Sequence, residues 1–120
     1  MLQIRVDQVE VLSNRGLNAQ IKAFAQGLRE RFAVQLSERG ISDAMVDDFV
    51  REGIGAASRH GIVGTSDVRL YLECMLVLSP CFDEDPKFAE LGEILIREKL
   101  TGTEKMALVH DHLLFGGYLD

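Results

Sequence analysis

The sequence lacks a long hydrophobic run. Its longest apolar stretch, LYLECMLVL, is interrupted by Glu73 and falls far short of the roughly 20 residues that cross a bilayer as a helix. The first residues, MLQIRVDQVEV, contain no apolar run behind a basic segment, so they do not resemble a secretory signal. We therefore expect a cytoplasmic protein that does not bind membranes.

Cysteine is scarce as well. The two cysteines, Cys74 and Cys81, lie seven residues apart without a CxxC spacing. In a cytoplasmic chain this pair is most simply interpreted as two small apolar side chains, and not as a disulfide or a metal site. A chain of 120 residues is long enough to fold around a hydrophobic core without such cross-links.

Positive charge is sparse in the second half of the chain. Residues 1–61 carry eight Lys or Arg and eight Asp or Glu, whereas residues 62–120 carry five against eleven. The second half therefore holds the whole formal charge of −6. Because nucleic-acid binding needs a cationic surface that releases counterions from the phosphates, we expect no nucleic-acid ligand and favour a basic partner for this half.

Signals for β-structure are almost absent. Polar and apolar residues alternate only in IRVDQVEV, where a short strand is the minor alternative, and no Asn-Gly or Asp-Gly hairpin turn is present. The chain also contains no internal repeat, low-complexity tract or linker. These absences predict an all-α fold: a single domain over residues 1–120, built as a compact bundle of five to seven helices.

The stretch at about residues 67–79 is apolar around nearly its whole circumference. Between residues 68 and 78 only Arg69 and Glu73 are charged, and at 100° per residue these two share one narrow sector as an i, i+4 pair. A helix of this kind must be covered almost all round. We therefore predict that residues 67–79 form the central helix of the bundle, wrapped by the others.

Apolar residues at three- and four-residue spacing predict the surrounding helices. The inner faces of the first two are Leu17, Ile21, Phe24, Leu28 and Phe32, then Val46, Phe49, Val50, Gly53, Ile54 and Ala57. Those of the last two are Phe88, Leu91 and Leu95, then Met106, Val109 and Leu113. Small residues such as Gly53 allow a neighbouring helix to approach closely. Whether residues 32–38 continue the first long helix or form a separate one stays open.

Local capping signals predict where the helices begin and end. Starts are expected at Asp7 with Glu10, at Ser42 or Asp43, at one of residues 65–67, at Asp85 with Pro86, and at Thr101 with Glu104. Stops are expected at Gly40, Gly61, Pro80 and the pair Gly116 and Gly117, and Gly16 is expected to weaken or kink the first helix.

Residues that suggest catalysis or metal binding do not form a credible site. No G-x-S-x-G, P-loop or G-x-G-x-x-G motif occurs. His110 and His112 point about 200° apart on a helix and so cannot hold one ion, and residues 83–85 lack the glycine and terminal Glu of a calcium loop. Nothing in the sequence activates Cys74 or Cys81 as a nucleophile. We therefore expect a non-enzymatic protein with no metal and no cofactor.

The order of segments resembles a family of small all-helical proteobacterial proteins. The matching motifs are Ile4 with Arg5; Ala57 with His60, Gly61 and Ile62; Thr65 with Asp67 and Val68; and Phe82 with Asp83, Asp85 and Pro86. The similarity spans nearly the full length and is most specific over residues 53–88. The chain departs from the pattern at Ser79 and Pro80, where glycine and a polar residue are usual, and in the tail FGGYLD.

The resemblance implies a helical fold and a protein-binding role. Members of this family are found beside type VI secretion effectors and their spike proteins, and some act as accessory chaperones that help to load or fold a toxin. We therefore expect a non-enzymatic accessory chaperone or adaptor that binds an effector, or its primary chaperone, in the cytoplasm. The alternative is an immunity protein that neutralises a cognate toxin and uses its acidic second half against a basic cleft.

The residues expected to bind the partner are apolar positions without an obvious covering helix. Leu70 and Val77 lie at the flanks of the central helix, where a lone subunit would leave them open. Phe115, Tyr118 and Leu119 are apolar residues on a glycine-rich terminus that would fold onto a partner or back onto the domain. A homodimer would hide Leu70 and Val77 equally well.

Overall fold

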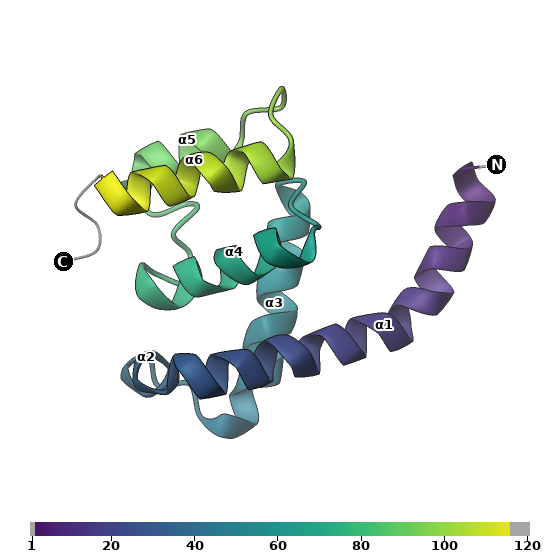
Figure 1. Cartoon of the computed structure of the whole chain (residues 1–120), viewed down its shortest axis with the longest axis horizontal. Helices are drawn as coiled ribbons and strands as arrows, with labels where there is room; N and C mark the ends of the chain where they lie inside the picture. The colour runs from purple at the N-terminus through teal and green to yellow at the C-terminus, as the bar shows by residue number, and fades with distance from the viewer. Residues whose placement is uncertain (1, 116–120) are drawn as a thin grey trace.

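The computed structural model describes the backbone of residues 2–115 and the side chains of residues 16–114. Within this part of the chain every regular element is a helix and no strand occurs. The elements are α1 (Leu2–Arg31), α2 (Ala33–Glu38), η1 (Asp43–Met45), α3 (Val46–Arg59), α4 (Thr65–Val77), η2 (Pro86–Phe88), α5 (Ala89–Leu95) and α6 (Gly102–Phe115), of which η1 and η2 are short 3₁₀ helices (Figure 1). The predicted all-α bundle of five to seven helices is confirmed. The strand considered for IRVDQVEV is wrong, because these residues belong to α1.

The first long helix ends before Phe32. α1 begins at Leu2 and continues through Gly16 to Arg31, so the helix start predicted at Asp7 with Glu10 is wrong. The side chains of these two residues lie outside those that are described. Phe32 has φ −126° and ψ 30°, a conformation that interrupts the helical path. Residues 33–38 therefore form a separate helix, which answers the question that the sequence left open.

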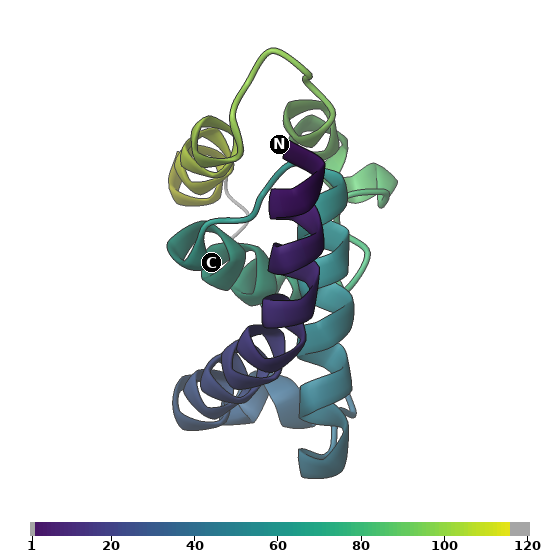
Figure 2. The same cartoon turned by 90° about the vertical axis from the view of Figure 1, so that its right-hand side faces the viewer.

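α4 lies in the middle of the bundle. Figures 1 and 2 show α5 and α6 on one side of it, the second half of α1 with α2 on the other, and α3 crossing between the two groups. α4 packs against α2, α3 and α6. Its buried residues are Val68, Tyr71, Leu72, Cys74, Met75 and Leu76. The predicted central helix is confirmed, with the bounds Thr65–Val77 in place of 67–79.

The N-cap that was expected among residues 65–67 is wrong. The N-cap is Gly64, in an extended conformation, and no side chain caps the first turn of α4. Asp67 instead accepts a hydrogen bond from Thr103 Oγ1 at 2.7 Å, which joins the start of α4 to the start of α6. A carboxylate in the first turn still interacts favourably with the positive end of the helix dipole.

The C-terminal end of α4 is capped by a side chain from another helix. Arg39, which follows α2, donates from Nε to the carbonyl oxygen of Leu76 at 3.0 Å and from Nη2 to that of Leu78 at 2.7 Å. The last carbonyls of a helix have no partner within the helix, and a cation near them also interacts favourably with the helix dipole. The guanidinium therefore fixes α2 against the end of the central helix.

Three of the other predicted boundaries agree with the structure in detail. Ser42 is the N-cap of η1 but its side chain forms no capping hydrogen bond, and Gly116 and Gly117 lie outside the described residues. Asp85 Oδ1 accepts a hydrogen bond from the Lys87 amide at 3.0 Å and opens η2, which leads directly into α5. Thr101 and Glu104 form a reciprocal capping box at the start of α6, with contacts of 2.9 and 3.1 Å. Gly61, after α3, has φ +76°, which only glycine adopts without strain.

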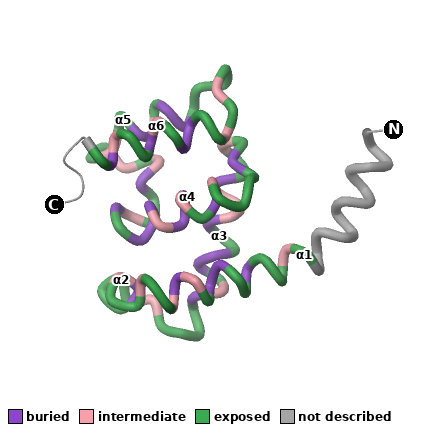
Figure 3. Tube along the Cα trace, in the orientation of Figure 1, coloured by how far each residue is buried: buried purple, intermediate pink, exposed green. Residues whose placement is uncertain are grey.

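The buried apolar residues form one cluster that runs from α1 to α6 (Figure 3). Most of the predicted inner faces lie in it, including Val46, Val50 and Ala57 of α3 and Met106, Val109 and Leu113 of α6. Leu17, Phe32, Ile54 and Phe88 were expected inside and are only partly buried. Among the described helices, none combines the length and the apolar character that crossing a bilayer requires.

α3 and α4 are held close by a glycine. A Cβ placed at Gly53 would collide with the side chain of Leu72 and would lie 3.0 Å from the sulfur of Met75. Leu72 is fully buried, so its side chain would have to shift within the core to make room. At Gly55, two residues further along α3, the nearest atom to such a Cβ is Arg59 Nη1 at 4.0 Å. Only Gly53 is therefore required for the close approach of the two helices.

The two glycines give a matched pair of substitutions. We predict that Gly53→Ala lowers the free energy of unfolding by about 1–3 kcal/mol, because overpacking displaces Leu72 and Met75. Gly55→Ala should raise it by up to about 1 kcal/mol, since alanine has the higher helix propensity. Urea unfolding followed by circular dichroism measures both values, and equal effects of the two changes would contradict the packing of α3 on α4.

Candidate functional site

An apolar groove lies between the end of α1, α4 and the second half of α6. Its volume is about 240 Å³, and its lining residues are Phe32, Leu70, Glu73, Cys74, Val77, His110, Leu113 and Leu114. Both predicted contact residues of the central helix, Leu70 and Val77, are therefore brought together on this groove. Leu70 is half-buried, whereas Val77 keeps 37% of its surface exposed.

The remaining predicted contact residues fall at the end of the described chain. Phe115 is the last residue of α6, and its side chain lies outside the described residues, as do Tyr118 and Leu119. The sequence analysis missed Leu114, which lines the groove with 55% of its surface exposed. The apolar spacing in α6 predicts that Leu113 faces the core. It does not predict whether the next residue, Leu114, lies against another helix or in solvent.

The charged groups of the groove lie along its edge. Glu73 forms an ion pair with Arg31 of α1, with Oε2 and Nη2 3.4 Å apart, and both side chains are partly exposed. His110 is exposed, and among the described residues it forms no hydrogen bond or ion pair. The floor is formed by Cys74, which is almost fully buried. The groove thus has an apolar floor and a polar rim, as protein-binding sites commonly do.

A second, polar cluster lies at the opposite side of α4. His60 Nε2 and Asp83 Oδ2 are 2.9 Å apart, and the two side chains are only 16% and 15% exposed. Lys105 of α6, itself buried, donates from Nζ to the carbonyl oxygen of His60 at 2.7 Å. Burial raises the pKa of the neighbouring Tyr71 hydroxyl well above its usual range, and the charge of Asp83 acts in the same direction. These contacts join the end of α3, the segment after α4, and α6.

This cluster opens onto a hollow of about 420 Å³ that also contains Cys81. A cysteine, a histidine and an aspartate in one hollow resemble a nucleophile, a base and its orienting group. However, no hydrogen bond joins the Cys81 thiol to His60 within the described chain, and Nε2 of His60 is bonded to Asp83. The arrangement is that of a structural bridge and lacks the thiol–imidazole contact that activates a nucleophile.

The residues considered for metal binding contact different parts of the protein and do not face one another. Nδ1 of His112 lies 3.6 Å from Oε2 of Glu90 on α5, whereas His110 lines the groove beside α4. Asp83 is paired with His60, and Asp85 caps η2. Over the residues that the structure describes, no group of three or more His, Cys, Asp or Glu side chains is arranged to hold a metal ion.

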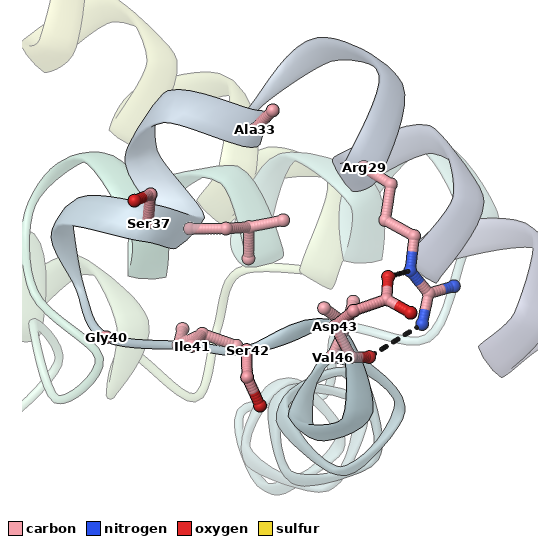
Figure 4. Close-up of a pocket in the computed structure, with 9 residues that line it drawn as sticks. Arg29, Ala33, Ser37, Gly40, Ile41, Ser42, Asp43 and Val46 are labelled. Carbon is pink, nitrogen blue, oxygen red and sulfur yellow. Dashed lines mark hydrogen bonds and ion pairs between the residues drawn. The ribbon is translucent and has the colours of Figure 1, made fainter.

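Another hollow, of about 520 Å³, lies between α1, α2 and the start of α3 (Figure 4). Its basic residue, Arg29, is already engaged with Asp43, which also lines the hollow: Nε lies 2.6 Å from Oδ1 of Asp43, and Nη2 donates to the carbonyl oxygen of Asp43 at 3.0 Å. Nη2 also lies 3.6 Å from Oδ1 of Asp47. Because these contacts use the guanidinium to fix the segment that leads into α3, we assign this hollow a structural role.

Comparison of the chain with family models, with curated proteins and with solved structures found no match.

The two cysteines should differ strongly in reactivity. Burial raises the pKa of the Cys74 thiol to about 12, and the charge of Glu73 acts in the same direction. At pH 8 about one Cys74 thiol in 10⁴ is then ionised, and the thiolate is the reactive form. We predict that an aromatic disulfide reagent at pH 8 modifies one thiol per native chain quickly and the second only after denaturation. In Cys81→Ser no fast thiol should remain, and two fast thiols in the native chain would contradict the burial of Cys74.

We expect His60, which belongs to the polar cluster, to contribute to the free energy of unfolding, and the exposed His110 to contribute almost nothing. His60→Ala leaves the Asp83 carboxylate shielded from solvent without its partner, so we predict a loss of about 2 kcal/mol in the free energy of unfolding. His110→Ala, at an exposed position, should change it by less than about 0.5 kcal/mol. Both values come from denaturant titration, and a His110 effect as large as that of His60 would be the opposite result.

Proposed function

We propose that this protein is a non-enzymatic accessory chaperone or adaptor, and that it binds a type VI secretion effector, or the primary chaperone of one, in the cytoplasm. The observation that carries the binding role is the apolar groove, on which two of the predicted contact residues meet. The link to secretion rests on the resemblance of residues 53–88 to the family described above.

The groove has the properties that a docking site for an apolar segment needs. Its floor belongs to the central helix, which is packed on several sides and therefore rigid before a partner binds. Val77 and Leu114, on two different helices, leave apolar surface open on either side of that floor. An amphipathic helix or a short apolar segment of the partner would bury this surface, as in other helix-in-groove complexes.

The charge around the groove favours a partner with basic residues beside its apolar ones. The second half of the chain, which supplies α4 and α6, carries eleven acidic and five basic residues. Glu73 lies on the rim and shares its charge with Arg31 over 3.4 Å, a pairing weak enough to exchange for a contact with a partner. Complementary charge of this kind accelerates association and selects the partner more than it adds affinity.

The binding test uses the purified full-length chain and the products of neighbouring effector or chaperone genes. We predict that one of these products co-elutes with the chain, and that Val77→Glu or Leu114→Glu weakens the complex at least tenfold because each places a charge on the apolar surface. Val34→Glu and Val63→Glu are matched controls at exposed valines outside the groove, and they should change the affinity less than twofold. Equal losses at all four positions, or no complex at all, would contradict the proposal.

A cellular measurement separates this proposal from the immunity alternative. Deleting the gene should lower the level or the secretion of the effector, because an accessory chaperone acts before export. If the effector is made and secreted normally while the cells lose protection from it, the protein is an immunity protein and the chaperone proposal is wrong.

A further inference from the structure

We infer that α6 swings away from α4, carrying α5 with it, about the polar contacts at its own start, and that this motion widens the apolar groove. The motion itself rests on the packing of the described helices. Its use rests on the proposed function, because the widened groove is the space that a helix of the partner would enter.

The groove is too narrow for a helix in the closed form. Its volume is about 240 Å³, which is below the roughly 300–1,000 Å³ of pockets that enclose a small molecule. An α-helix with its side chains is about 10–12 Å across. The closed groove therefore admits side chains of a partner but not a whole helix, which needs a wider space between α4 and α6.

The polar contacts of α6 with the helices before it all lie at one end. In its first turn, Thr103 Oγ1 donates to Asp67 of α4, and Lys105 Nζ donates to the carbonyl oxygen of His60 at the end of α3, each at 2.7 Å. Among the described residues, none from 106 to 114 forms a side-chain hydrogen bond or an ion pair with α1, α2, α3 or α4. The start of α6 is thus fixed, whereas its second half is held against α4 by apolar packing.

α5 is attached to α6 more than to the rest of the bundle. It packs mainly against α6 and η2, and Figure 1 shows both helices on the same side of α4. Oε2 of Glu90 on α5 lies 3.6 Å from Nδ1 of His112, so the second half of α6 has its ion pair with α5 and not with α4. The two helices can therefore move together while their contacts with each other stay in place.

A small rotation at the fixed end of α6 is enough to open the other end. From Lys105 to Leu114 the helix rises by about 14 Å, at roughly 1.5 Å per residue. A rotation of about 20° then moves Leu114 by about 5 Å, close to half the width of a helix. Because the hydrogen bonds of Thr103 and Lys105 lie at the pivot, the motion costs chiefly the apolar contacts of residues such as Leu113.

A thiol on the floor of the groove reports the motion without any partner. Cys74 is almost fully buried between α4 and α6, so it becomes accessible when α6 moves away. In Cys81→Ser it is the only thiol, and its slow modification over hours by an aromatic disulfide reagent is compared with the rate in the urea-unfolded chain. The ratio of the two rates gives the uncovered fraction. We expect this fraction to exceed the unfolded fraction from urea titration at least tenfold.

Two further substitutions separate the motion of α6 from unfolding of the whole chain. Leu113 lines the groove beside Cys74, whereas Val46 lines the hollow between α1, α2 and the start of α3, on the other side of α4 (Figure 1). Leu113→Ala should raise the modification rate at least tenfold, because it removes apolar contacts that keep the groove closed. Val46→Ala lowers the stability of the whole fold, but it should change the rate less than twofold, since α3 stays packed when α6 moves.

Two outcomes would overturn the inference. If Val46→Ala raises the rate by the same factor as the unfolded fraction, Cys74 is uncovered only when the whole chain unfolds. If the rate in Cys81→Ser rises with urea as steeply as global unfolding does, no smaller part of the chain opens. The urea comparison decides the question even if Leu113→Ala or Val46→Ala fails to fold. Because no partner takes part, a failed binding test for the proposed function leaves these results unaffected.

Discussion

The rest of the structure depends on the need to cover the apolar surface of α4. Six of its thirteen residues are buried, and the helix packs against α2, α3 and α6. Each neighbour is adapted to this task in a different way. α3 provides the space at Gly53 that Leu72 and Met75 occupy, and α2 is followed by Arg39, whose guanidinium takes the free carbonyls at the end of α4. The positions of α3 and α2 are thus fixed by apolar packing along the sides of α4 and by hydrogen bonds at its C-terminal end.

The same constraint explains why a groove remains. Arg69 and Glu73 give α4 one narrow polar sector, which does not need to be covered, and Glu73 is held there by Arg31. The residues next to that sector, Leu70 and Val77, lie between the covered and the polar parts of the helix and are only partly shielded. A central helix with a single polar stripe therefore produces an apolar site beside that stripe. This origin links the fold to the proposed binding role without any residue that serves binding alone.

Features that depend on neighbouring residues in the sequence were predictable, and those that join distant residues were not. The capping box of Thr101 and Glu104 and the apolar run of α4 are local, and the structure contains both. Asp67 looked like an N-cap by the same rules, but Thr103, 36 residues away, takes its carboxylate. Arg39 was missed because its acceptors on α4 are about as distant in the sequence. The incomplete cover of Leu70 and Val77 could be predicted because both lie beside the polar sector of an otherwise apolar helix. The place of Leu114 on the groove depends on how α6 is rotated against α4, which the sequence does not show.

Native-state hydrogen exchange of the backbone amides tests most directly the claim that α4 is the element on which the others depend. The account predicts that the amides of residues 71–76 are the slowest in the chain, and that their opening free energy equals the global free energy of unfolding measured with denaturant. Amides of α2 and α5, which are short, should open at lower free energies. If the amides of α4 exchange faster than those of α6 or α3 while these helices stay protected, α4 is not the centre of the fold and the account is wrong.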